Sequence, residues 1–441
     1  MMEKEIVIIG GGPAGYTLAS RLAKCGREVL LIEKGKMGGT CLNVGCIPTK
    51  AFLQRNDDQS WQEALEKQRV IIEASRQNME AELLGMEIEI RYGTASFASE
   101  ETLSIQEEAG TRIVKFGSCI VATGSRSRLV PQAVVRGNIC TSTEFLNLNQ
   151  CPEELVIIGG GIIGIEAAEI CSLYGGKTTI LERDENILTG WDEDIVNIYM
   201  RTLKEKNIEI YTDCHIEEIE DEGEQCTCIF RRGNIYDEKV CDKVLISVGR
   251  EPEIESLNLA AAQIDHNVSG IEVDDNFMTS NKRVFAIGDC ISGGEKFAHI
   301  AEYQAYILAG ILCDKQYVQA EGTPMCCYSN PQMMQIFRRG NREQPNLTRK
   351  KMYRANPIAS IHGERNCMIK MSANRNSHEI TAIAAIGEGV SELSGEAAII
   401  INNKMRLENI AYSIHMHPTI NEEIHQLARE MLAELENEDY N

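Results

Sequence analysis

Two cysteines, Cys41 and Cys46, lie in the segment Cys-Leu-Asn-Val-Gly-Cys-Ile-Pro-Thr-Lys, which ends at Lys50. They follow a glycine-rich turn of the kind that binds dinucleotides. Paired thiols carry electrons by forming and breaking a disulfide, and the thiolate is the reactive form. A dithiol just after a nucleotide-binding turn therefore predicts a redox-active pair placed against a flavin.

A disulfide between these two cysteines requires a break in regular helix. Five helical residues rise ~7.5 Å along the axis, whereas disulfides seldom join Cα atoms more than ~7 Å apart. Gly45 and Pro48 are the residues suited to such a distortion. A purely structural disulfide is the alternative interpretation. The chain has 16 cysteines and no signal-peptide pattern, which favours a reducing cytoplasm and argues against that alternative.

The glycine-rich turn occurs twice. Each copy follows a strand-like run, precedes a helix pattern and has the spacing G-x-G-x-x-G. Its glycines are Gly10, Gly12 and Gly15 in the first copy and Gly159, Gly161 and Gly164 in the second. An acid follows the third glycine by 18 residues in both copies (33 − 15 and 182 − 164), at Glu33 and Glu182. Two such copies predict two dinucleotide-binding units.

The same physical roles apply to both turns. The first glycine permits the tight turn, the second lets the backbone approach a pyrophosphate, and the third lets helix and strand pack closely. The helix N-terminus then presents N–H groups to the phosphates. Glu33 and Glu182 can accept hydrogen bonds from a ribose diol. A carboxylate at Glu182 would repel a 2′-phosphate and favours NAD over NADP, although Arg183 follows it.

Length and charge limit the class of protein. The chain has 441 residues, enough for about three domains. Its net charge of −22 should repel nucleic acid and anionic membranes. No run approaches the ~18 apolar residues that span a bilayer. We therefore expect a cytoplasmic protein without a nucleic-acid or membrane partner, and we expect no metal site.

The remaining pattern suggests how these turns are positioned. One long helix is expected over about 58–84, with an apolar stripe that includes Trp61 and Leu65. Later strands end in glycine at Gly124, Gly249 and Gly288. Beyond about residue 322, alternating strands such as 368–371 and 380–386 precede helices near 391–402 and 421–436. This last part predicts an α+β domain with a mostly antiparallel sheet.

On these residues the chain resembles the flavoprotein disulfide reductases, and within them the dihydrolipoyl dehydrogenases. The resemblance spans nearly the whole length and follows the family's order of motifs. The motifs are the two glycine turns, the Cys41–Lys50 segment, Ala122–Ser125, Val248–Arg250, Ala286–Asp289 and His415–Glu422.

The resemblance implies an α/β fold with two Rossmann-like domains and a third, α+β domain. The first would bind FAD and comprise residues 1–149 and 276–322. The second, residues 150–275, would bind NAD, and residues 323–441 would form the interface of a homodimer. The implied reaction is oxidation of dihydrolipoamide, free or on a lipoylated carrier protein, through a Cys41/Cys46 disulfide and FAD to NAD⁺.

The resemblance also assigns catalytic roles. Cys41 is the thiol that meets substrate, and Cys46 is the charge-transfer thiol against the flavin. His417 and Glu422 of one subunit act on Cys41 of the other. His417 suits the role of base because its unperturbed pKa lies near working pH, and Glu422 can orient the imidazole as a triad carboxylate does. His415 is expected to be a packing residue.

Further residues are implied in cofactor binding. Lys50 lies near the flavin in this family and pairs with a glutamate on the NAD-unit helix, here Glu166. A buried lysine needs such a partner because an isolated buried charge is costly. The implied FAD and NAD contacts are Gly10, Gly12, Pro13, Ala14, Gly15, Glu33, Lys34, Gly39, Thr40, Lys50, Thr123, Gly124, Ser125, Gly288, Asp289, Ala298, Gly159, Gly161, Gly164, Glu182 and Gly249.

Two alternatives stay open. One is an NADH-dependent reductase of another small disulfide, because the stretch between Cys46 and Ala122, which walls the substrate channel in the family, is shorter than usual. The other is a non-catalytic flavoprotein subunit, which retention of the full thiol and base set argues against. The last cysteine is Cys367, which argues against a mercuric reductase or a larger thioredoxin reductase, since these enzymes need a further redox pair near the C-terminus.

Overall fold

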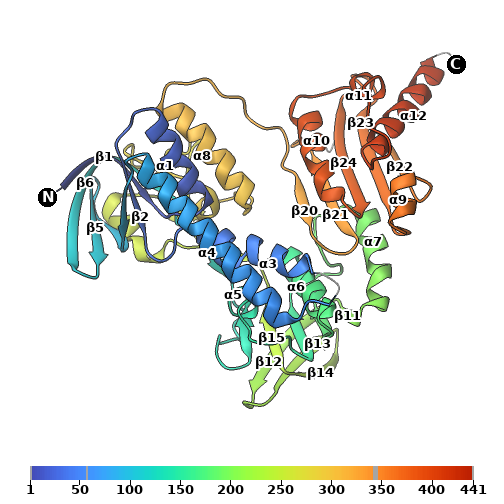
Figure 1. The fold of residues 1–441 in the computed structure, drawn as a ribbon. Helices are drawn as coiled ribbons and strands as arrows, with labels where there is room; N and C mark the ends of the chain where they lie inside the picture. The colour runs from blue at the N-terminus through green and yellow to red at the C-terminus, as the bar shows by residue number, and fades with distance from the viewer. Residues whose placement is uncertain (1, 56–57, 341–345, 440–441) are drawn as a thin grey trace. The chain divides into compact units, whose positions relative to one another are not determined.

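The computed structural model describes residues 2–55, 58–340 and 346–439, and the chain forms two compact units (Figure 1). Unit 1 comprises Met1–Cys151 and Leu245–Val318. Unit 2 comprises Pro152–Val244 and Gln319–Asn441. The boundaries between an FAD, an NAD and an interface domain stay a prediction.

A seven-stranded sheet forms the centre of unit 1, in the order β3-β2-β1-β6-β5-β4 with β19 also paired to β6. The pairs among β1, β2, β3, β6 and β19 are parallel, whereas β4, β5 and β6 pair antiparallel. The strands are β1 (Met2–Ile9), β2 (Val29–Glu33), β3 (Glu89–Tyr92), β4 (Thr94–Ser99), β5 (Thr102–Glu107), β6 (Gly110–Val121) and β19 (Val284–Ala286). Every residue of β2 is buried, as expected for a parallel strand covered on both faces.

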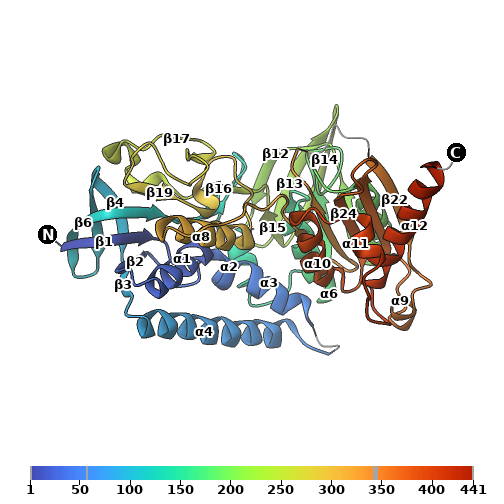
Figure 2. The same cartoon turned by 90° about the horizontal axis from the view of Figure 1, so that it is seen from above.

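Helices α1 and α8 lie side by side against this sheet (Figures 1 and 2). Leu18 and Leu22 of α1 share one buried cluster with Ala305 and Leu308 of α8. The helices of unit 1 are α1 (Pro13–Lys24), α2 (Gly39–Val44), α3 (Cys46–Leu53), α4 (Trp61–Gly85), α5 (Ser142–Phe145) and α8 (Ala298–Leu312). Its short strands are β7 (Ser125–Ser127), β8 (Ile139–Thr141), β16 (Arg250–Pro252), β17 (His266–Asn267) and β18 (Gly270–Ile271), and β15 (Lys243–Ile246) spans the boundary of the units.

The expected long helix is α4, which begins three residues later than predicted. Ser60 caps it: the Ser60 hydroxyl accepts from the Glu63 N–H at 3.3 Å, and the Glu63 carboxylate accepts from the Ser60 N–H at 2.8 Å. This reciprocal capping box fixes where the helix starts. Trp61 and Leu65 are buried as expected, so the apolar stripe packs against unit 1.

Unit 2 contains the second glycine turn within a parallel sheet. Strands β9 (Glu154–Ile158), β10 (Lys177–Leu181) and β11 (Ile208–Tyr211) pair in parallel around β10. Helix α6 (Ile162–Leu173) follows β9, and α7 (Glu193–Thr202) follows β10. A three-stranded antiparallel meander comes next, formed by β12 (Cys214–Asp221), β13 (Cys226–Arg232) and β14 (Ile235–Cys241).

The last part of unit 2 is the predicted α+β region. Its five strands are antiparallel throughout, in the order β20-β21-β24-β23-β22. They are β20 (Met325–Cys327), β21 (Gln332–Phe337), β22 (Asn346–Met352), β23 (Met368–Asn374) and β24 (Ile380–Gly387), accompanied by α9 (Pro357–Ile361), α10 (Val390–Asn402), α11 (Leu407–Ala411) and α12 (Glu422–Asp439). Apolar residues from this sheet and from α10, α11 and α12 form one core. In the described part of the chain, none of the helices is both long and apolar enough to cross a membrane.

Candidate active site

The helix that carries the two cysteines is broken between them at Gly45. Helix α2 ends at Val44 and α3 begins at Cys46, and Gly45 has φ −140° and ψ −112°. A Cβ on Gly45 would lie 2.9 Å from the Thr40 carbonyl oxygen, so a side chain would crowd the backbone here. The expected distortion is therefore present, and it is centred on Gly45.

Pro48 also favours that break, because a continuous helix would need its missing N–H to bond to the carbonyl of Val44, the last residue of α2. It is the third residue of α3, where a backbone N–H has no intrahelical acceptor and proline is tolerated. Gly45 and Pro48, the two residues that the sequence singled out, therefore both fit a helix that stops at Val44 and restarts at Cys46.

The break brings the sulfurs of Cys41 and Cys46 within hydrogen-bonding reach of each other. The hydrogen bond with Cys46, burial, and the negative charges of Cys46 and Glu302 raise the pKa of Cys41, while the Lys50 ammonium acts in the opposite direction. Cys41 therefore holds its proton more firmly than an ordinary thiol does. Cys41 needs an external base to become a nucleophile.

The first glycine turn forms a close-fitting cradle. Gly10 has φ +110°, and a Cβ on Gly15 would lie 1.8 Å from the Gly10 carbonyl oxygen. A Cβ on Gly39 would lie 2.8 Å from the Gly12 Cα. Gly12 has no side chain to cap α1, which begins at Pro13, so the first N–H groups of α1 are left for a ligand. These features fit the pyrophosphate of FAD.

Glu33 and Glu182 perform a second task that sequence reasoning missed. Glu33 Oε2 accepts from the Gly11 N–H at 2.7 Å, and Glu182 Oε2 accepts from the Gly160 N–H at 2.6 Å. In both turns the other carboxylate oxygen accepts from the N–H two residues further along, at 2.7 and 2.8 Å. Each acid thus holds its turn in place. Each oxygen keeps a lone pair for a ribose hydroxyl.

Arg250 links the thiol segment to the predicted flavin residues. Its Nε donates to Ser125 Oγ at 2.7 Å, and its Nη2 donates to the Ser125 carbonyl at 2.6 Å and to Thr40 Oγ1 at 3.3 Å. Ser125 Oγ donates in turn to Asp289 Oδ2 at 2.6 Å. Burial lowers the pKa of Arg250, and the charges of Asp289 and Cys46 oppose that effect. The sequence indicated Arg250 only as the end of a motif and gave it no role. The signal that could have identified it as a site residue is its position as a charged residue directly after the strand-ending Gly249.

The other predicted cofactor residues of unit 1 lie at the ends of elements. Lys34 forms an ion pair with Glu253 at 2.9 Å. Pro13 and Ala14 open α1, Thr123 and Gly124 lie between β6 and β7, Gly249 precedes β16, Gly288 opens a 3₁₀ turn, and Ala298 opens α8. Strand and helix ends are where ligands bind in such sheets.

In unit 2, Gly159 has φ +105° and Gly161 precedes the first residue of α6, repeating the geometry of the first turn. Gly164 and Glu166 both lie within α6. Glu166 is buried (5 % exposed), and its Oε1 accepts from the Tyr328 N–H at 3.0 Å. The pairing of Glu166 with Lys50 stays a prediction.

His417 and Glu422 form the predicted pair at the start of α12. His417 Nδ1 lies 3.0 and 3.2 Å from the two Glu422 carboxylate oxygens, and the Thr419 N–H donates to Glu422 Oε2 at 3.0 Å. The Thr419 N–H and His417 lower the pKa of Glu422, so the carboxylate stays ionised. The His417 side chain is 68 % exposed. This arrangement orients Nδ1 and leaves Nε2 available to take a proton.

His415 has a different environment from His417. Its Nε2 lies 2.8 Å from Glu396 Oε1, and its ring stacks on His425 with centroids 4.9 Å apart. This environment is that of the packing residue expected from the sequence.

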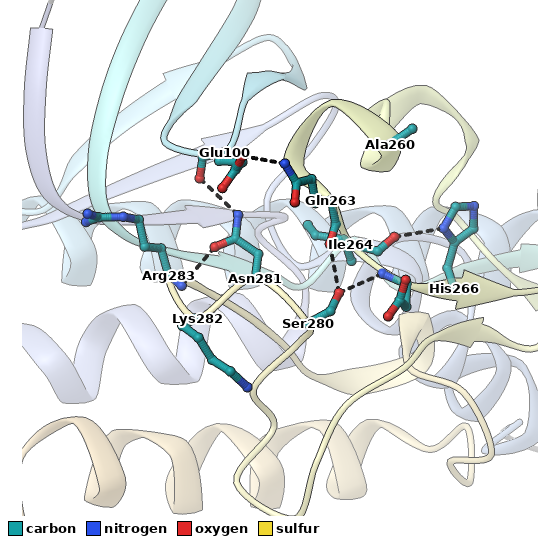
Figure 3. A pocket seen from close by; sticks show the side chains of 10 residues that line it. Glu100, Ala260, Gln263, Ile264, His266, Ser280, Asn281, Lys282 and Arg283 are labelled. Atoms are coloured by element: carbon teal, nitrogen blue, oxygen red, sulfur yellow. Dashed lines mark hydrogen bonds between the residues drawn. The ribbon is translucent and has the colours of Figure 1, made fainter.

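Unit 1 also has an open cavity of about 800 Å³ (Figure 3). Its polar groups bond to one another: Asn281 Nδ2 donates to the Glu100 carbonyl at 3.0 Å, and Ser280 Oγ donates to the Gln263 carbonyl at 2.8 Å. Its lining residues are different from the predicted site residues.

Comparison with known proteins shows the family. Residues 4–305 match the pyridine nucleotide-disulphide oxidoreductase model, and residues 344–428 match the dimerisation domain of those proteins. A dihydrolipoyl dehydrogenase of Bacillus subtilis is 32% identical over 96% of this chain and 97% of its own. A dihydrolipoyl dehydrogenase of Geobacillus stearothermophilus is 31% identical over 96% of this chain and 94% of its own. The chain therefore belongs to the pyridine nucleotide-disulphide oxidoreductase family.

Solved structures share the fold. The HOCl-induced flavoprotein disulfide reductase RclA from Escherichia coli, in a Cu(II) complex, has a TM-score of 0.90 at 24% identity, covering 97% of this chain and 99% of that one. LpdA from Mycobacterium tuberculosis has a TM-score of 0.89 at 19% identity, covering 98% of this chain and 100% of that one. The predicted fold class is confirmed, as are the oxidoreductase class and the cofactors FAD and NAD. The dimerisation-domain match supports a homodimer.

We predict that Gly15→Ala weakens FAD retention and lowers the free energy of unfolding. The new Cβ would meet the Gly10 carbonyl oxygen at 1.8 Å, and overpacking of this kind costs about 1–3 kcal/mol. Gly85→Ala is the matched control, because Gly85 ends α4 and its Cβ would have nothing within 4 Å. Bound FAD per chain and the thermal midpoint check the prediction. Equal FAD retention in the two variants would contradict it.

Proposed function

We propose that this chain is a dihydrolipoyl dehydrogenase, a cytoplasmic homodimer. It oxidises dihydrolipoamide, free or on a lipoylated carrier protein, and uses NAD⁺ as the final acceptor. The observation that carries the proposal is the break at Gly45, which brings the Cys41 and Cys46 thiols together in the unit that contains the first glycine turn. The names of the relatives at about 30% identity support the substrate.

The thiol chemistry begins with the enzyme disulfide between Cys41 and Cys46. His417 of a second subunit takes a proton from one substrate thiol at Nε2, and the substrate thiolate attacks Cys41 Sγ. The S–S bond breaks and Cys46 leaves as a thiolate. The second substrate thiol then attacks the substrate sulfur of the mixed disulfide, which releases the cyclic disulfide product and Cys41. Cys41 takes its proton from His417, which then accepts the proton of the second substrate thiol and releases it to solvent.

The electrostatics explain why attack falls on Cys41. The sulfur with the lower pKa leaves faster in thiol–disulfide exchange. The pKa of Cys41 is raised, and the partly buried Arg250 guanidinium is placed to stabilise a thiolate at Cys46, so Cys46 is the better leaving group. The chemistry that FAD supplies when bound is acceptance of the electron pair and its delivery as a hydride to NAD⁺.

Glu182 is proposed to set the preference for NAD over NADP. Its carboxylate is held at the second glycine turn by the Gly160 N–H, where it would repel a 2′-phosphate. Glu182→Ser should lower the ratio of kcat/KM for NADH over NADPH by about tenfold or more, because the carboxylate that repels the 2′-phosphate is then absent. Glu185→Ser removes the same charge from an exposed position three residues on and should leave the ratio unchanged. An unchanged ratio in Glu182→Ser would rule out this role.

The experiment that tests the function compares two steady-state reactions of the purified holoenzyme. One is NAD⁺ with dihydrolipoamide, and the other is NADH with a panel of small disulfides that includes lipoamide. We expect the lipoamide couple to have the highest kcat/KM in both directions. A strong preference for another disulfide would replace the proposed substrate and leave the thiol chemistry intact.

A further inference from the structure

A second pair of cysteines lies at the far ends of α1 and α8, away from the ends that carry predicted cofactor residues. Cys25 directly follows the last residue of α1, and Cys313 directly follows the last residue of α8. The two helices pack side by side, and the two thiols hydrogen-bond to each other. Both residues are partly exposed, so solvent oxidants can reach them.

Two cations surround this pair. Lys315 Nζ donates to Cys25 Sγ at 3.5 Å. Arg27 Nη1 donates to the Leu312 carbonyl at 2.9 Å, which ties the end of α8 to the segment that follows α1. The negative end of each helix dipole disfavours a thiolate at these positions. The hydrogen bond with Cys313, followed by the contacts of Lys315 and Arg27, lowers the pKa of Cys25 against the opposing effect of burial.

Most cysteines of the chain lie in a different environment. Cys119 and Cys290 are fully buried, and burial raises the pKa of both thiols, that of Cys290 to about 11. Such thiols are inert. Cys25 has the opposite combination of exposure, a cationic neighbour and a second thiol in reach, which is the environment of a thiol that reacts with oxidants.

We propose that Cys25 and Cys313 are a second redox pair, in which a hydroperoxide oxidises Cys25 and Cys313 resolves it as a disulfide. The Cys25 thiolate attacks the terminal peroxide oxygen, so that an S–O bond forms, the O–O bond breaks, and hydroxide (from hydrogen peroxide) or alkoxide (from an organic hydroperoxide) leaves and takes up a proton. The Cys313 thiol then attacks the sulfenic sulfur, so that the S–S bond forms and water leaves. The dithiol loses two electrons and two protons, and the hydroperoxide is reduced to water and the corresponding alcohol or, for hydrogen peroxide, to a second water. Excess small-molecule thiol reduces the disulfide to the two cysteine thiols and is itself oxidised to its disulfide.

The structural consequence is a covalent staple between α1 and α8. The other ends of these helices begin at Pro13 and Ala298, both predicted to contact FAD. Joining the distant ends removes the freedom of the two helices to separate, because a cross-link constrains the open states of the chain. We expect the oxidised holoenzyme to release FAD more slowly on heating than the reduced holoenzyme.

The test treats reduced, FAD-loaded enzyme with hydrogen peroxide at neutral pH, blocks remaining thiols by alkylation and analyses peptides by mass spectrometry. We expect a Cys25–Cys313 cross-linked peptide that disappears when dithiothreitol is added. Cys313→Ser should instead leave Cys25 as a sulfenic acid that dimedone traps. Cys151→Ser, at another partly exposed cysteine of the same unit, should leave the cross-link unchanged.

Lys315→Met isolates the role of the cation without touching either sulfur. We expect it to slow Cys25 oxidation about tenfold, because the thiolate fraction falls as the pKa of the thiol rises. Recovery of Cys25 and Cys313 as separately alkylated thiols, at peroxide doses that oxidise Cys151, would overturn the proposal. So would a rate of Cys25 oxidation that Lys315→Met leaves unchanged.

Discussion

Cys46→Ser lowers kcat/KM for dihydrolipoamide oxidation by about a thousandfold or more, because exchange needs a disulfide with a good leaving sulfur. Without Cys46 the remaining thiol, Cys41, has neither an intramolecular partner nor a route to the flavin. The variant should keep its FAD, since the glycine turn and the Arg250–Ser125–Asp289 contacts are untouched. Steady-state assay beside the flavin spectrum checks both statements.

The matched control for that variant is Cys151→Ser, which removes a partly exposed thiol from the same unit. It should retain full dithiol oxidation. The charge-transfer absorbance of the two-electron-reduced enzyme should be lost in Cys46→Ser and kept in the control. Survival of more than a tenth of the activity in Cys46→Ser would show that electrons reach FAD by another path.

His417→Gln lowers dithiol oxidation by about 10²–10⁴-fold, the range that positioned acid–base groups supply. The imidazole is held by Glu422 at 3.0 Å and is otherwise exposed, so its removal should leave the fold and the bound FAD intact. His215→Gln is the control, because His215 is exposed on β12 of the same unit. A loss below fivefold in His417→Gln would leave the base unidentified.

Subunit mixing tests whether His417 acts across the dimer. Equal amounts of Cys46→Ser and His417→Gln chains, unfolded and reassembled together, should form mixed dimers with one complete site each. With random pairing, activity should recover to about a quarter of the wild-type value. A base that acts on the cysteines of its own chain predicts no recovery.

Glu422→Gln should shift the pH dependence in a defined direction. The Glu422 carboxylate stays ionised because the Thr419 N–H and His417 lower its pKa, and its charge stabilises the His417 imidazolium. A neutral amide removes that charge and the support it gives to the imidazolium. The acid limb of the kcat/KM profile then moves to lower pH while the plateau rate drops. An acid limb that moves to higher pH would contradict this reasoning.

Much of this site was predictable because it is built from local patterns. The two glycine turns and their acids recur at one spacing, and the distance between Cys41 and Cys46 already required a break in the helix. The antiparallel sheet of β20 to β24 followed from alternation along each strand. His417 and Glu422 lie five residues apart, so their contact was also local.

The features that were missed depend on pairs far apart in the chain. Arg250 reaches Ser125 and Thr40, which are 125 and 210 residues away in sequence, and no local pattern predicts such contacts. The pairing of Cys25 with Cys313 depends in the same way on how α1 and α8 pack. The hydrogen bonds from Glu33 and Glu182 to their glycine turns were also missed. The sequence motif assigns these acids to ribose binding and gives no sign that they also bond to the backbone. The meander of β12 to β14 was also not predicted.

The central claim is that a dithiol and a flavin work in series in this chain, and anaerobic reductive titration with dithionite tests it most directly. The wild-type holoenzyme should take up about four electrons per bound FAD, two for the Cys41–Cys46 disulfide and two for the flavin. The Cys41→Ser/Cys46→Ser double variant should take up about two. Uptake of about two electrons by the wild-type enzyme would contradict the account.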